Sequence, residues 1–128
     1  MVTLVLNSLF PEADEKECSL TKRSLTQYKK MRAVVEDFER NYGHQHQKRV
    51  YEQAKETVKN IDRAINLILD EEVRRIIQFR FTENGRGNSH KLTVLRFSGS
   101  MGDRTVDRKI IEGIESVANT LKLWGELE

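Results

Sequence analysis

Hydrophobic residues recur every three or four positions along most of this chain, with polar and charged residues between them. This spacing is typical of amphipathic helices, in which the apolar side chains lie on one face. The chain has one proline, Pro11, and long stretches without glycine, which also favour helix. The pattern predicts helices at about 16–42, 47–69, 70–81, 91–98 and 103–123. We therefore expect an all-α protein.

The first two predicted helices have the most regular stripes, and a short polar segment around Gly43 joins them. The first stripe consists of Leu20, Ser24, Tyr28, Met31, Val35, Phe38 and Tyr42. The second stripe consists of Val50, Ala54, Val58, Ile61, Ile65 and Ile68. A short connection between two helices of similar length favours an antiparallel hairpin. We expect residues 1–15 to form an N-terminal arm, and residues 16–69 to form a hairpin that serves as a platform for self-association or for a protein partner.

The segments after residue 70 follow the order of a helix-turn-helix unit. A helix capped by Asp70 is followed by a polar loop, a short helix, a glycine-containing turn at 99–102 and a longer helix. Val106 and Ile110 begin the apolar stripe of the longer helix and are expected to face the core. In such units the first turns of the second helix present polar side chains to DNA base edges. The pattern therefore predicts a helix-turn-helix unit at 70–128.

Several polar side chains in this unit are suited to contacts with DNA. Arginine can donate two hydrogen bonds to guanine, threonine can contact a thymine methyl group or a phosphate, and lysine neutralises phosphate. Asp107 could orient a neighbouring arginine or accept a hydrogen bond from cytosine. The candidate DNA-binding residues are Arg86 in the loop, Lys91 and Arg96 in the short helix, and Arg104, Thr105, Asp107, Arg108 and Lys109 in the last helix. The alternative is that they form the ordinary solvated surface of a terminal amphipathic helix.

The net charge of +2, from 22 Lys and Arg and 20 Asp and Glu, conceals an uneven distribution. Residues 73–110 include nine basic and three acidic residues, whereas residues 111–128 include one and four. Positive charge thus surrounds the start of the helix predicted at 103–123, whose first turns would contact DNA bases, and this favours nucleic acid as the partner. Residues 21–50 carry a net charge of +5. We interpret the basic residues at 22–32 as a solvated helix face rather than a second DNA contact.

No combination of residues in the sequence supports catalysis, a cofactor or a metal site. His44 and His46 lie two positions apart, which on a helix turns them to different faces, and no third ligand lies near them in sequence. Cys18 is the single cysteine and has no neighbouring histidine. No apolar run is long enough to span a membrane. We expect a soluble, cytoplasmic protein that is not an enzyme.

Three segments match motifs of a known kind of regulator. Residues 9–16 read LFPEADEK, and residues 101–109 read MGDRTVDRK. The first is similar to the L-F-P-E-x-D-E-K start of ArpU-type proteins, and the second resembles the I-S-[ED]-R-T opening of the recognition helix in ArpU and RinA regulators of phage late operons. Residues 70–81 resemble the preceding helix of these proteins, which region 4 of sigma-70 also has. The chain departs from the family pattern in the turn, where Gly99 and Gly102 replace commoner residues.

The resemblance implies a sigma-region-4-like helix-turn-helix in a transcriptional regulator of prophage packaging or lysis genes. It also implies that Arg104, Thr105 and Arg108 read bases or phosphates. Region 4 of sigma factors contacts RNA polymerase as well, and the residues of this chain leave open whether it does so.

The leading hypothesis from the sequence is therefore a sequence-specific regulator that binds double-stranded DNA. A phage small-terminase-like packaging component is an alternative, because such proteins also join a helix-turn-helix to helical oligomerisation elements. A helical protein-interaction module without DNA activity is a third.

Overall fold

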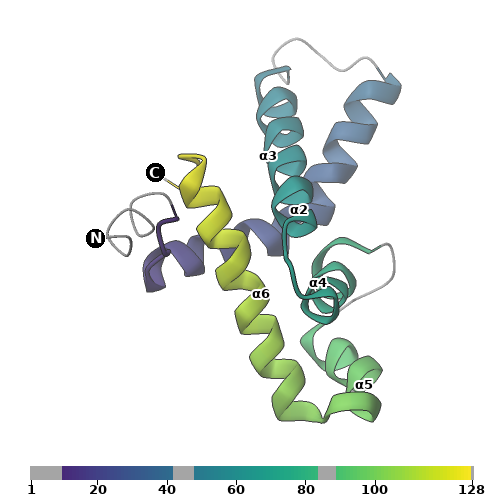
Figure 1. Cartoon of the computed structure of the whole chain (residues 1–128). Helices are drawn as coiled ribbons and strands as arrows, with labels where there is room; N and C mark the ends of the chain where they lie inside the picture. The colour runs from purple at the N-terminus through teal and green to yellow at the C-terminus, as the bar shows by residue number, and fades with distance from the viewer. Residues whose placement is uncertain (1–9, 42–47, 84–88, 128) are drawn as a thin grey trace, which may run out of the picture.

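The computed structural model describes residues 10–41, 48–83 and 89–127. Its helices are α2 (Glu15–Asn41), α3 (Lys48–Asn66), α4 (Glu71–Ile77), the π-helix η2 (Gln78–Thr82), α5 (His90–Met101) and α6 (Asp103–Leu123). These ranges contain no strand, which confirms the predicted all-α class (Figure 1). Tyr42, His44 and His46, on which sequence predictions were made, lie outside the described residues.

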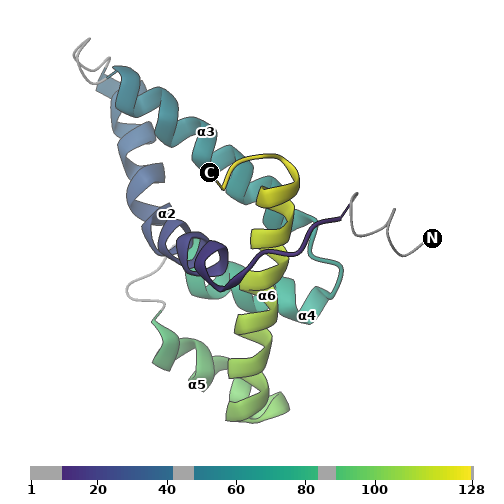
Figure 2. The ribbon, with the colours of Figure 1, turned by 90° about the vertical axis from the view of Figure 1, so that its left-hand side faces the viewer.

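Helices α2 and α3 lie side by side and run in opposite directions (Figures 1 and 2). The middle of α2 meets the end of α3, where the Tyr28 hydroxyl donates a hydrogen bond of 2.6 Å to Asp62. The end of α2 meets the start of α3, where the rings of Phe38 and Tyr51 stack with centroids 4.2 Å apart.

The predicted stripe of α2 is wrong at its N-terminal end. Thr21 and Leu25 are fully buried, whereas Leu20 is 37% exposed. This half of α2 also packs against α6, so that its inward face is turned by about one residue from the predicted one. Thr21 can be buried because its hydroxyl donates a hydrogen bond of 2.9 Å to the Glu17 carbonyl one turn earlier. In α3, Val50 also departs from the prediction, because it is 58% exposed.

Helix α6 runs through the middle of the molecule and packs against α2, α3, α4 and α5 (Figure 2). Its apolar stripe is buried as predicted, at Val106, Ile110, Ile114, Val117 and Leu121. One hydrophobic cluster joins these side chains to those of α2, α3, α4 and η2. The predicted segments 16–69 and 70–128 therefore share a single core.

Helix α4 crosses α6 at Gly113, which is buried. A Cβ atom added there would overlap the Ile77 side chain and approach Val73 Cγ1 to 3.1 Å. The predicted cap of α4 is present, since the Asp70 carboxylate accepts hydrogen bonds from the Glu72 and Val73 amides. The helix predicted at 70–81 changes at Gln78 to π geometry, in which the Glu83 amide donates to the Gln78 carbonyl.

Helix α5 is longer than predicted, and the turn after it is shorter. The sequence predicted a helix at about 91–98 and a turn at 99–102, but the helix continues to Met101 and only Gly102 separates it from α6. Gly102 has φ 82° and ψ 157°, a conformation open mainly to glycine. Gly99 and Ser100 continue the helix, where both are exposed, and the Ser100 hydroxyl donates to the Phe97 carbonyl at 3.0 Å.

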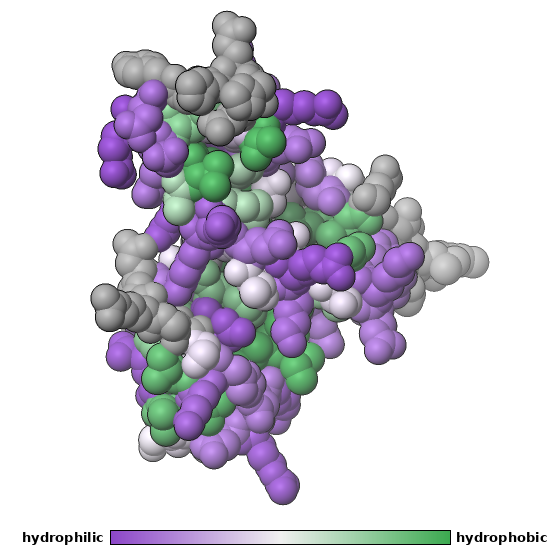
Figure 3. Space-filling view, turned by 180° about the vertical axis from the view of Figure 1, so that it is seen from behind, coloured by the Kyte–Doolittle hydropathy of each residue, from purple (hydrophilic) through white to green (hydrophobic). Residues whose placement is uncertain are grey.

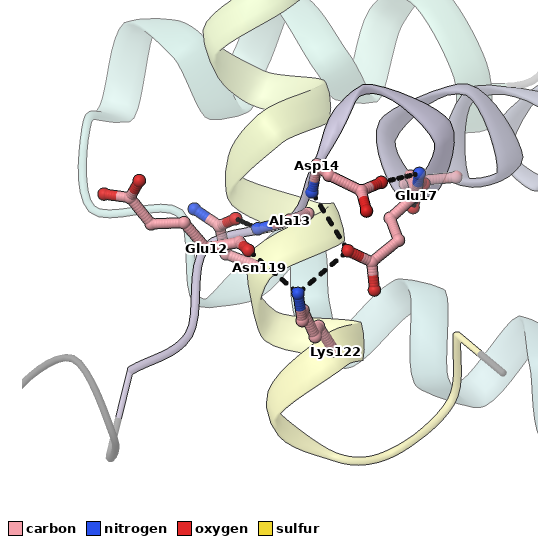
Figure 4. A network of polar contacts seen from close by, with 7 residues as sticks. Glu12, Ala13, Asp14, Glu17, Asn119 and Lys122 are labelled. Atoms are coloured by element: carbon pink, nitrogen blue, oxygen red, sulfur yellow. Dashed lines mark hydrogen bonds and ion pairs between the residues drawn. The ribbon is translucent and has the colours of Figure 1, made fainter.

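The segment before α2 lies against the C-terminal half of α6 (Figure 4). The Ala13 amide donates to Asn119 Oδ1 at 2.7 Å, and Lys122 Nζ donates to the Glu12 carbonyl at 3.0 Å and to Glu17 Oε1 at 2.8 Å. Asp14 and Glu17 also form a reciprocal capping box at the start of α2. The acidic motif at 12–17 therefore caps α2 and ties both ends of the described chain together.

Candidate nucleic-acid interface

The candidate interface is built from α5 and the first two turns of α6, which meet at Gly102. Ser89 caps α5 by accepting a hydrogen bond from the Leu92 amide. Thr93, in the first turn of α5, is fully buried. Phe97 holds α5 to the rest of the protein, because its ring packs edge-on against Phe79 of η2 with centroids 5.7 Å apart. These contacts leave the other side of α5 to solvent.

In the first two turns of α6, buried positions recur every four residues and the positions between them are exposed or half-buried. Val106 is fully buried and Ile110 is 6% exposed, so this side of the helix is anchored in the core. Arg104 and Arg108 are exposed, and Thr105 is half-buried between them and the core. Anchoring on one side fixes the direction in which the two arginines project.

Arg104 and Arg108 differ in their neighbours. Arg108 Nε lies 3.6 Å from Glu112 Oε1, one turn later on the exposed side of the helix. Such a solvated pair is worth little and can open when a phosphate or base approaches. Within the described part of the chain, no ion pair involves Arg104. Binding of a phosphate or base would therefore break no ion pair among the described residues at Arg104, whereas at Arg108 it would open the pair with Glu112.

Lys109, a candidate DNA-binding residue, is turned toward α4 rather than toward solvent. Its side chain is only 13% exposed, and its Nζ lies 2.7 Å from Glu72 Oε1 and 3.8 Å from Asp70 Oδ2. The hydrogen bond that Lys109 donates to Glu72, together with the negative charge of Asp70, raises the pKa of Lys109. Lys109 thus joins α6 to the start of α4. Spacing along one helix does not indicate these partners, because Asp70 and Glu72 lie across the helix interface.

Asp107 lies beside α5 rather than beside a neighbouring arginine, and its Oδ1 accepts no hydrogen bond within the described residues. Its Oδ1 lies 2.8 Å from His90 Nε2, across the angle between the two helices. This contact places the start of α5, including the exposed Lys91, beside the second turn of α6. No spacing in the sequence indicates that His90 meets Asp107, because the two residues belong to different helices.

Two further candidates remain, Arg96 on α5 and Arg86 in the predicted loop before it. Arg96 is exposed, and its guanidinium carbon lies 5.1 Å from the Phe79 ring centroid and 5.9 Å from that of Phe97. Arg86 lies outside the described residues. Leu92 and Leu95, which the sequence analysis did not single out, are 43% and 64% exposed on the same helix.

Metal-binding groups and membrane-spanning helices were sought in residues 10–41, 48–83 and 89–127. These ranges contain no group of three or more His, Cys, Asp or Glu side chains placed to hold a metal ion. None of the described helices is both long enough and apolar enough to cross a membrane. Comparison of the chain with protein-family models, curated proteins and solved structures found no match.

Proposed function

We propose that this chain is a sequence-specific regulator of transcription that binds double-stranded DNA through α5 and the first two turns of α6. The observation that carries the proposal is the projection of Arg104 and Arg108 from one side of α6 while Val106 and Ile110 anchor the other side. A rigid helix with outward arginines can place guanidinium groups against guanine edges in the major groove.

Lys91 and Arg96 add positive charge on the neighbouring helix, where they can neutralise phosphates on either side of the groove. The likeness of residues 9–16 and 101–109 to ArpU and RinA regulators makes prophage packaging or lysis genes the expected targets. In this assignment Thr105 supports the two arginines as a phosphate or thymine-methyl contact, and Asp107 lies beside His90.

The test begins with selection of bound sequences from a random duplex library by the full chain. Binding to the selected duplex is then measured for Arg104→Ala and Arg108→Ala. Each substitution should weaken binding by about 1–3 kcal/mol and relax the preference at one base position. Arg49→Ala, at an exposed arginine at the start of α3, is the matched control and should bind like the wild type. Unchanged affinity and preference in both α6 variants would remove these residues from the interface.

A second candidate, a small-terminase-like component that assembles into oligomers, is favoured by a groove between α2 and α3. The groove has a volume of about 670 Å³. Its lining residues are Lys30, Ala33, Val34, Asp37, Phe38, Val50 and Tyr51. Hydrophobic side chains are visible at this end of the molecule in Figure 3. Ring-sized particles in light scattering, lost on Val50→Lys, would favour this candidate, whereas a small particle of constant size would favour the regulator.

A further inference from the structure

A cluster of cations lies where α2 packs against the π-helix η2, away from the residues assigned above. Its members are Lys29 and Arg32 of α2 and Arg80 of η2. The Arg32 guanidinium carbon lies 5.5 Å from the centroid of the Tyr28 ring, and that of Arg80 lies 4.7 Å from the centroid of the Phe81 ring. Both rings belong to the core cluster, so the two guanidinium groups are held at its edge.

Lys29 is placed next to these two arginines and is itself half-buried. Burial, and then the charges of Arg80 and Arg32, lower the pKa of Lys29, and the opposing effect of Glu83 is smaller. Glu36 lies 3.9 Å from Arg32 Nε, but it is mostly exposed. An anion added beside Lys29 would offset the two arginine charges that lower its pKa.

The basic surface continues beyond the cluster onto α5. Arg96 lies over Phe79, and Phe79, Arg80 and Phe81 follow one another in η2. Cations from α2, η2 and α5 thus border the same five-residue segment. A row of cations drawn from three elements suits a chain of phosphates better than one small ion, because a polyanion can contact several of them at once.

The geometry points to a phosphate-binding site at the α2–η2 junction, where Lys29, Arg32 and Arg80 contact the phosphodiester backbone of the duplex that α6 reads. This inference rests on the proposed function and adds to it a second point of contact outside the helix-turn-helix. It replaces the sequence interpretation of Lys29 and Arg32 as part of a merely solvated helix face.

The test measures binding of the full chain to the selected duplex and to a random duplex, by fluorescence anisotropy, from about 50 to 200 mM salt. Lys29→Gln should reduce the slope of log affinity against log salt by about 1 on both duplexes, and leave their affinity ratio unchanged. Arg80→Gln should do the same, whereas Arg80→Lys should retain the slope. Lys16→Gln is the control, on the same helix but roughly 20 Å away at 1.5 Å per residue. Thermal melts of each variant establish that it is folded.

The outcomes separate this site from the proposed function. If Arg104→Ala loses sequence preference but Lys29→Gln and Arg80→Gln both match Lys16→Gln, the α2–η2 site is overturned and the proposed function stands. If Lys29→Gln lowers the slope while Arg104→Ala keeps its preference, the site stands and the reading residue is wrong. Saturable binding of inorganic phosphate that Lys29→Gln abolishes, without any change on DNA, would overturn the DNA backbone as its ligand.

Discussion

At the scale of single residues, glycines at two positions of similar helical geometry have opposite surroundings. Gly113 of α6 is buried against Ile77 and Val73 of α4, whereas a Cβ at Gly99 of α5 would meet nothing within 4 Å. The sequence shows only that Gly113 lies in a predicted helix and Gly99 in a predicted turn. Which of them is essential depends on the α4–α6 crossing, which brings together residues far apart in the chain.

Gly113→Ala should therefore destabilise the protein, although alanine is the better helix former. Overpacking of this kind costs about 1–3 kcal/mol, while the gain in helix propensity is about 1 kcal/mol. Gly99→Ala has the gain without the overlap and should stabilise the protein by roughly 0.5–1 kcal/mol. Chemical denaturation of both variants checks the pair. Equal effects of the two substitutions would contradict the close packing of α4 on α6.

Tyr28 gives a prediction about alkaline pH. Burial, followed by its hydrogen bond to Asp62, raises the pKa of Tyr28 from 10.0 to about 12. The folded state thus holds the phenol proton more tightly than the unfolded state, so this stabilisation is complete below pH 10 and is lost as pH rises toward 12. The free energy of unfolding of Tyr28→Phe, measured from neutral pH to about pH 11, should fall less steeply than that of the wild type. Parallel curves would show that the phenol proton does not contribute.

At the scale of elements, the sequence predicts long regular helices well and their junctions poorly. The stripe of α6, from Val106 to Leu121, is correct because one face of this helix is buried along most of its length. The predicted extent of α5 is wrong because glycine is common in turns, whereas Gly99 lies inside the helix, which ends at Met101. The stripe of α2 is shifted at Thr21 because its partner there is α6, which lies about a hundred residues later in the chain.

The contact between the N-terminal segment and α6 can be tested as an element. Asn119→Ala removes the acceptor for the Ala13 amide, so exchange of that amide with solvent should become faster while the amides of the α6 core keep their protection. Glu115→Ala, an exposed position on the same helix, is the control. Hydrogen exchange followed by NMR measures both. Unchanged exchange at Ala13 would mean that the segment is held by Lys122 and the capping box without Asn119.

At the scale of the whole molecule, one core joins the antiparallel pair α2–α3 to the C-terminal helices, and cations occupy its outer side at two places. The candidate residues that the sequence placed on α6 divide accordingly. Arg104 and Arg108 are exposed. Asp107 lies next to His90 of α5, and Lys109 forms ion pairs with Asp70 and Glu72. Spacing along one helix could show which side faces the core, but it could not show which exposed charges other helices would use.

The central claim, that duplex DNA binds across α5 and the start of α6, is tested most directly by mapping amide chemical shifts during a titration with the selected duplex. The largest chemical-shift changes are expected in residues 90–96 and 103–109, with smaller changes around Lys29 and Arg80. The C-terminal half of α6, at Asn119 and Lys122, should be unchanged. Changes confined to the groove between α2 and α3, or no change at low salt, would contradict this claim.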